Sequence, residues 1–190
     1  MRHNPDIRIQ ITMGNTEELL NGLRNGSCHF ALIEGFFPRE EFSFRTYSIE
    51  NFIPVCAATH TFSRNPTRLQ DLLPESLILR EQGSGTRDIF ERALQLHNIS
   101  LSSFSHITEL NSMYAIVQLL LEDCGISFLY ETAVRHYMDS GNLKKISLQD
   151  FHIQHEFSFL WQKGSVFAEE YEDIFSQLKT YSAQHITPSL

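Results

Sequence analysis

The sequence has few basic residues and no stripe of them. It holds 15 Lys and Arg against 23 Asp and Glu, which gives a formal net charge of -8 at pH 7. The two densest basic stretches, residues 64–68 and 144–145, are short. A surface that binds nucleic acid neutralises phosphates with clustered Lys and Arg. We therefore do not expect this chain to contact DNA or RNA by itself.

Long hydrophobic runs and cysteines are also scarce. The longest strongly apolar stretch, Ile116–Leu121, is far shorter than the ~20 residues of a membrane-spanning helix, and the polar start after Met1 does not resemble a secretory signal. Cys28, Cys56 and Cys124 are odd in number and have no C-x-x-C spacing. We expect a cytoplasmic protein with free, buried thiols and with no cofactor or metal.

Segments with strand and helix patterns alternate along the chain, which is typical of an α/β fold. Residues 7–13 alternate apolar and polar side chains and predict a half-buried strand. A helix over residues 16–25 follows, and Asn15 and Glu18 have the spacing of an N-terminal capping pair. Residues 29–33 predict the next strand. Because the two strands flank a helix, we expect them to be parallel.

The same alternation continues to the end of the chain. Strands are predicted at residues 42–47, 52–58, 77–79, 104–110, 126–129 and 156–161, and helices at residues 86–97, 112–122, 131–139 and 166–181. The order predicts two α/β lobes joined by two crossover strands. Residues 1–58 and 155–190 would form lobe I, and residues 59–154 lobe II. A cleft between two lobes is a common place for a small molecule.

A turn bracketed by glycines, R-E-Q-G-S-G-T-R-D, occupies residues 80–88. Ser84 and Thr86 supply hydroxyls, and the unsatisfied amides at the start of the following helix favour an anion. The same turn could also be a helix cap that binds nothing. It is not a P-loop, because no Lys follows Gly85, nor a dinucleotide loop, because Asp88 stands where the third glycine would be.

Several segments resemble, in order, the effector-binding domain of LysR-type transcriptional regulators. The most specific is L-I-L-R-E-Q-G-S-G-T-R-D-I-F-E-R-A-L at residues 77–94. Residues 4–11 resemble the family's second strand, residues 14–33 the next helix and strand, and residues 108–129 a later helix and strand. Tyr130 stands where the family usually has proline. The resemblance covers nearly the whole chain.

The resemblance implies two Rossmann-like lobes, as in a type 2 periplasmic binding protein, with a small-molecule effector in the hinge cleft. It also implies a homodimer, for which helices 16–25 and 112–122 are the candidate contact faces, and a tetramer in the full-length protein. DNA would be bound only through a winged helix-turn-helix domain that this chain lacks. Because the chain opens just before the second strand, we expect the domain's first strand and most of its first helix to be missing.

The resemblance places effector contacts on both walls of the cleft. The candidates, which lie where strands end or helices begin, are Asn15, Thr16, Glu34, Gly35, Ser84, Gly85, Thr86 and Asn111. We expect a metabolite with a carboxylate or similar anionic group. A carboxylate at position 34, however, would repel an anion and would favour an amine.

Two other classes share this fold. A solute-binding protein of a transport system would need a signal peptide or a lipid-anchor cysteine near its start. An enzyme would need charged catalytic side chains in the cleft, for which Glu34 and Arg87 are the available pair. Ser84 has no G-x-S-x-G elbow around it. His152 and His155, at the entry of a strand, would point to opposite faces, so neither nucleophilic catalysis nor a metal site is predicted.

Overall fold

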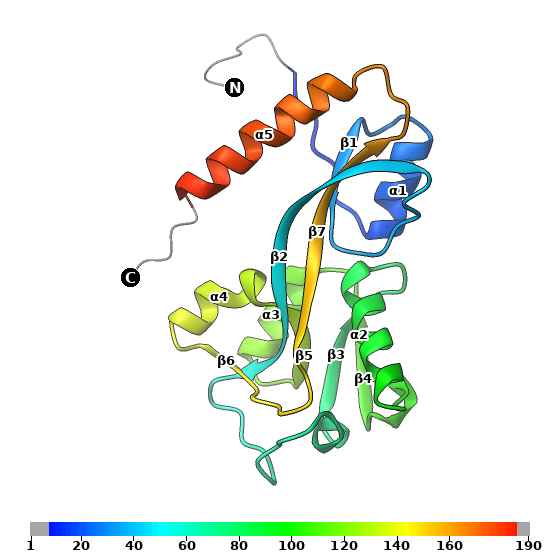
Figure 1. Ribbon diagram of the computed structural model, residues 1–190. Helices are drawn as coiled ribbons and strands as arrows, with labels where there is room; N and C mark the ends of the chain where they lie inside the picture. The colour runs from blue at the N-terminus through cyan, green and yellow to red at the C-terminus, as the bar shows by residue number, and fades with distance from the viewer. Residues whose placement is uncertain (1–7, 186–190) are drawn as a thin grey trace.

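The computed structural model describes residues 8–185, and side chains up to residue 182. A single mixed sheet runs through the molecule, and helices gather at its two ends (Figure 1). Its strands are β1 (Phe30–Ile33), β2 (Phe42–Ala57), β3 (Ser76–Arg80), β4 (His106–Leu110), β5 (Ile126–Tyr130), β6 (Leu143–Lys145) and β7 (Ile153–Gln162). Their order is β1-β7-β2-β5-β3-β4, with β6 also paired to β2. The α/β class is confirmed.

Two long antiparallel strands, β2 and β7, connect the two lobes and run side by side along the molecule (Figure 1). The strands expected at residues 42–47 and 52–58 are therefore one strand. The polar residues between them interrupt the apolar pattern but not the pairing, since Asn51 lies opposite Gln154 and accepts a 3.0 Å hydrogen bond from its side chain. The two crossover strands are confirmed, whereas the residue boundaries of the lobes stay a prediction.

The helices cover both faces of the sheet in each lobe. They are α1 (Thr16–Arg24), α2 (Gly85–Leu96), α3 (Met113–Leu121), α4 (Glu131–Asp139) and α5 (Ala168–His185), with short 3-10 helices at Leu69–Leu72 and Leu101–Ser103. In lobe I α1 packs on the face of Leu160, while α5 packs on the opposite face, that of Phe159 and Trp161. Phe90 of α2 stacks on Phe128 at 4.1 Å in one core cluster. Ile116 of α3 and Val134 of α4 belong to a separate cluster. The two clusters place α2 on one face of the sheet and α3 and α4 on the other.

The start of lobe I differs from the sequence-based expectation. Residues 8–13 form no strand, and Ile11 and Met13 are 82% and 92% exposed. β1 pairs antiparallel with β7 and not with a parallel neighbour. The prediction of a strand is therefore wrong for residues 8–13, and residue 7 lies outside the described residues. The prediction that this strand and β1 form a parallel pair is also wrong. Alternation makes a strand only where a partner takes its hydrogen bonds, and in the described part of the chain β1 pairs with β7 alone.

One strand was not predicted, and the expected burial of the cysteines holds only in part. β6 was missed, because three residues carry too little pattern to be recognised. Cys56 is fully buried, and burial raises the pKa of its thiol to about 11, but Cys124 is exposed. It lies in the turn between α3 and β5, where Asp123 and Gly125 have positive φ angles of 56° and 153°.

Of the helices that the structure describes, none is both long and apolar enough to cross a lipid bilayer.

Candidate functional site

The N-terminus of α1 is held by a capping box. The Asn15 side chain accepts the Glu18 backbone N–H at 3.0 Å, and the Glu18 carboxylate accepts the Asn15 backbone N–H at 3.0 Å. This confirms the capping pair. The Glu17 backbone N–H donates to the carbonyl of Gly83 at 3.4 Å. The first turn of α1 therefore meets the glycine-bracketed turn of lobe II directly.

The N-terminus of α2 is formed by that turn. Ser84 is the N-cap residue, with φ -74° and ψ 131°, but its side chain makes no capping bond. Ser84 and Thr86 are each only 2% exposed. The Ser84 Oγ has no hydrogen-bond partner among the described residues. Gly83 has φ +88°, a left-handed conformation that glycine adopts without strain, and this lets the chain enter the helix abruptly.

Two glycines allow the lobes to touch. A Cβ atom added to Gly85 would lie 2.7 Å from Thr16 Oγ1 and 2.8 Å from the Gly35 Cα. A Cβ added to Gly35 would lie 2.7 Å from the same Oγ1 and 3.0 Å from the Gly85 Cα. Such distances are shorter than van der Waals contact. Glycine is therefore required at both positions, one in each lobe, for this packing.

A side-chain bond crosses between the lobes beside this contact. The Thr86 Oγ1 donates a hydrogen bond to Oε1 of Glu34, which follows β1. Burial raises the pKa of Glu34, while bonds from the Thr86 hydroxyl and backbone N–H and the positive charge of Arg80 act against the shift. The carboxylate of Glu34 thus lies at the positive end of α2, where the sequence predicted an anion.

An ion pair that sequence reasoning missed lies next to Glu34. Arg80 holds Glu81 through two bonds, Nε to Oε2 at 2.8 Å and Nη2 to Oε1 at 3.1 Å. Burial would raise the pKa of Glu81, but the Arg80 bonds, with a bond from the Asn15 side chain, hold that pKa below its ordinary value. The signal was available, because R-E stands directly before Q-G-S-G-T.

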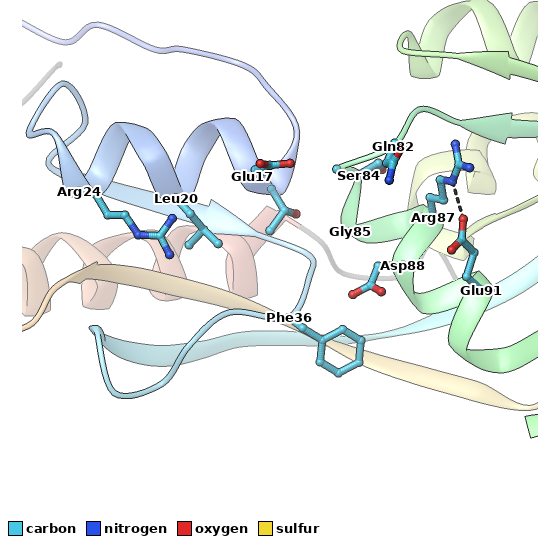
Figure 2. A pocket seen from close by; sticks show the side chains of 12 residues that line it. Glu17, Leu20, Arg24, Phe36, Gln82, Ser84, Gly85, Arg87, Asp88 and Glu91 are labelled. Atoms are coloured by element: carbon cyan, nitrogen blue, oxygen red, sulfur yellow. Dashed lines mark hydrogen bonds and ion pairs between the residues drawn. The ribbon is translucent and has the colours of Figure 1, made fainter. Parts of the chain in front are cut away.

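Two cavities flank the contact between the lobes. The larger, of about 450 Å³, lies between α1 and α2 (Figure 2). Figure 2 shows Glu17, Leu20 and Arg24 on its lobe I side facing Ser84, Asp88 and Glu91 on its lobe II side. The smaller, of about 180 Å³, is lined by Asn15, Thr16, Glu34, Arg80 and Phe157, among others. Thr16 lines both cavities, so the contact divides the space between the lobes.

Seven of the eight expected contact residues come together here. Asn111 does not: it is exposed at the start of α3, and it lines neither cavity. Glu34 and Arg87, the charged pair that an enzyme would need, are also not joined by an ion pair in the described residues. Arg87 instead holds Glu91 at 2.6 Å and Glu109 at 2.5 Å. Within residues 8–185 no group of three or more His, Cys, Asp or Glu side chains could hold a metal ion.

Comparison with protein families and with curated sequences identifies the same family of transcriptional regulators. The family described as "LysR substrate binding domain" matches residues 1–182. The uncharacterized HTH-type transcriptional regulator YeiE of Escherichia coli K12 is 27% identical over 148 residues, which are 77% of this chain and 50% of YeiE. The HTH-type transcriptional regulator CysL of Bacillus subtilis is 22% identical over 157 residues, or 82% of this chain and 52% of CysL. The chain spans about half the length of the curated relatives it matches.

Solved structures share the fold. The Synechocystis PCC6803 CcmR regulatory domain in complex with 2-PG superposes with a TM-score of 0.82 at 18% identity, covering 97% of this chain and 88% of that one. The effector-binding domain of QuiR in complex with shikimate gives a TM-score of 0.75 at 21% identity, covering 97% and 86%. At such identities the likeness establishes the two-lobed architecture.

Proposed function

Because the chain belongs to the LysR substrate binding domain family, we propose that it is the effector-binding regulatory domain of a cytoplasmic LysR-type transcriptional regulator. A small metabolite binds between the lobes and shifts the populations of their relative arrangements. The observation that carries this proposal is the N-terminus of α2, which faces lobe I with two buried hydroxyls, one of them without a hydrogen-bond partner in residues 8–185. The family is one of transcriptional regulators, not of enzymes.

Most of the proposed contacts lie in the space between the lobes. Ser84, Gly85 and Thr86 offer hydroxyls and first-turn amides to an anionic group. Asn15 and Thr16 bound the same space from α1. Glu34 and Gly35 complete the lobe I wall, and Asn111 stays a proposed contact although it lies apart from the others.

Assembly and DNA binding are proposed for the longer protein. α1 and α3 are the proposed faces of a homodimer of this domain, and exposed Tyr114 of α3 is available for such a contact. A tetramer would form in the full-length regulator. DNA would be contacted by a winged helix-turn-helix domain, which fits the net charge of -8 on this chain. A change in lobe arrangement would then alter how the DNA-binding domains are spaced.

The test is a thermal-shift screen against small carboxylates, phosphates, sulfate and amines. A compound that binds only the folded protein raises the melting temperature. We expect at least one compound to do so, and we expect Ser84→Ala and Thr86→Ala to abolish the shift. Thr180→Ala, which removes an exposed hydroxyl on α5, should preserve it. A shift that survives both cleft substitutions would refute the proposed site.

A further inference from the structure

The anion site at the start of α2 already holds an anionic group from the same chain. Thr86 donates its hydroxyl to Glu34 Oε1, and the unsatisfied first-turn amides of a helix favour negative charge at this position. A carboxylate is also the group expected on the effector. We propose that the Glu34 carboxylate occupies the N-terminus of α2 when no effector is bound, and we call it the resident ligand of that site. An anionic effector must displace it in order to bind. This proposal rests on the proposed function.

The backbone around Glu34 holds it in this position. Gly35 follows it and packs against Gly85, so that the Glu34 side chain starts within reach of the first turn of α2. Glu34 and Thr86 are 52 residues apart in the chain and come from different lobes. The bond therefore depends on how the lobes are arranged. Displacing Glu34 removes a side-chain tie between the lobes, which links ligand binding to lobe arrangement.

The site has more bonding capacity than Glu34 uses. Ser84, at the same helix end, buries its Oγ without a partner among the described residues. A buried polar group without a partner is costly, and native structures contain few of them. A ligand with two or more acceptor oxygens can take the Thr86 hydroxyl and the Ser84 hydroxyl together. Such a ligand gains a bond that Glu34 does not make.

The charged groups around Glu34 make its displacement feasible. Arg80 of β3 attracts the carboxylate, while Glu81, directly after β3, repels it. Tyr130, at the end of β5, buries its hydroxyl nearby without a partner among the described residues. Because burial penalises the charged carboxylate, Glu34 regains hydration when it leaves. The incoming anion replaces its charge, so the cleft keeps its electrostatic balance.

The experiment measures sulfate affinity by isothermal titration calorimetry from about pH 4.5 upward to about pH 8, because burial raises the pKa of Glu34 above its ordinary value of 4.5. Wild type is compared with Glu34→Gln, which keeps the shape of the side chain and loses its charge. Glu172→Gln is the matched control, because it makes the same substitution on α5. Glu172 pairs with Arg45 and lines neither cavity between the lobes.

At about pH 8 we expect Glu34→Gln to bind sulfate at least about tenfold more tightly than wild type, because a neutral amide competes with sulfate for the N-terminus of α2 less well than a carboxylate does. Glu172→Gln should change the affinity by less than about threefold, since the effect of a partly exposed, paired charge is small. Wild-type affinity should fall as pH rises through the pKa of Glu34, whereas Glu34→Gln should show no such fall. This wild-type pH profile does not depend on how the variant folds.

Equal affinities and equal pH profiles in wild type and Glu34→Gln would overturn the resident ligand. The absence of sulfate binding in both proteins would also overturn it, because removal of the Glu34 charge would then have exposed no anion site. If neither protein binds sulfate while the thermal-shift screen still finds a compound whose shift is abolished in Ser84→Ala and Thr86→Ala, the proposed effector function stands without the resident ligand. If the screen also fails, both proposals fall.

Discussion

Substitution of Gly85 by alanine tests the contact that brings the lobes together. The new Cβ would lie 2.7 Å from Thr16 Oγ1 and 2.8 Å from the Gly35 Cα, against about 3.5–4.0 Å for an unstrained contact between carbon atoms. The Thr16 side chain can rotate away. The Gly35 Cα belongs to the backbone, so either α2 shifts or the lobes separate.

The size of the effect follows from two opposing contributions. Overpacking of this kind costs about 1–3 kcal/mol, while alanine is favoured over glycine by at most about 1 kcal/mol within a helix. We therefore expect a net loss of about 1–2 kcal/mol in the free energy of unfolding. For a chain of this size the melting temperature should fall by about 2–8 °C.

Circular dichroism at increasing temperature measures this change. Gly22→Ala in α1 is the matched control, because its Cβ would meet only side-chain atoms, Cys28 Sγ at 3.0 Å and Ser27 Oγ at 3.3 Å. It should lower the melting temperature by less than about 2 °C, since flexible side chains can yield. Adding Thr16→Ala to Gly85→Ala should recover only part of the loss, because the backbone contact remains. If Gly85→Ala melts like Gly22→Ala, the close approach of the lobes is wrong.

Two further outcomes are expected. Phe90→Ala should lower the free energy of unfolding by about 3–5 kcal/mol in urea denaturation, because Phe90 is fully buried and stacks on Phe128; a loss below about 1 kcal/mol would contradict this core. Because burial raises the pKa of Glu34 above its ordinary value of 4.5, its contribution to stability is present below about pH 4.5 and is lost as pH rises through the raised pKa. Glu34→Gln should remove this part of the pH dependence of unfolding, and an unchanged dependence would contradict the assignment.

Local signals accounted for most helices and for the glycine-bracketed turn. Periodic apolar residues place α2 and α4 within one residue of their predicted bounds. Asn15 and Glu18 form the capping box that their spacing predicted. Such features depend on residues three or four positions apart, so a single sequence contains the information for them.

Signals that depend on a distant partner were less reliable. Residues 8–13 alternate as a strand should, yet they are unpaired, since alternation says which side chains share a face and not which strand accepts the hydrogen bonds. Asn111 has the right residue type at a helix start but lies away from the other contacts. β2 joined two predicted strands, because β7 pairs with the polar residues between them.

The sequence by itself indicated the family, through the resemblance of its motifs, and it predicted the two-lobed α/β fold and a glycine-bracketed helix start at residues 83–86, because short motifs and periodicity are local features. Only the tertiary structure decided what faces that turn. The folded chain brings Glu34 from 52 residues away to the hydroxyl of Thr86 and packs Gly35 on Gly85. Within the part of the chain that the structure describes, it leaves Ser84 Oγ without a hydrogen-bond partner. Contacts between lobes depend on how β2 and β7 carry one lobe against the other, and no local pattern encodes that.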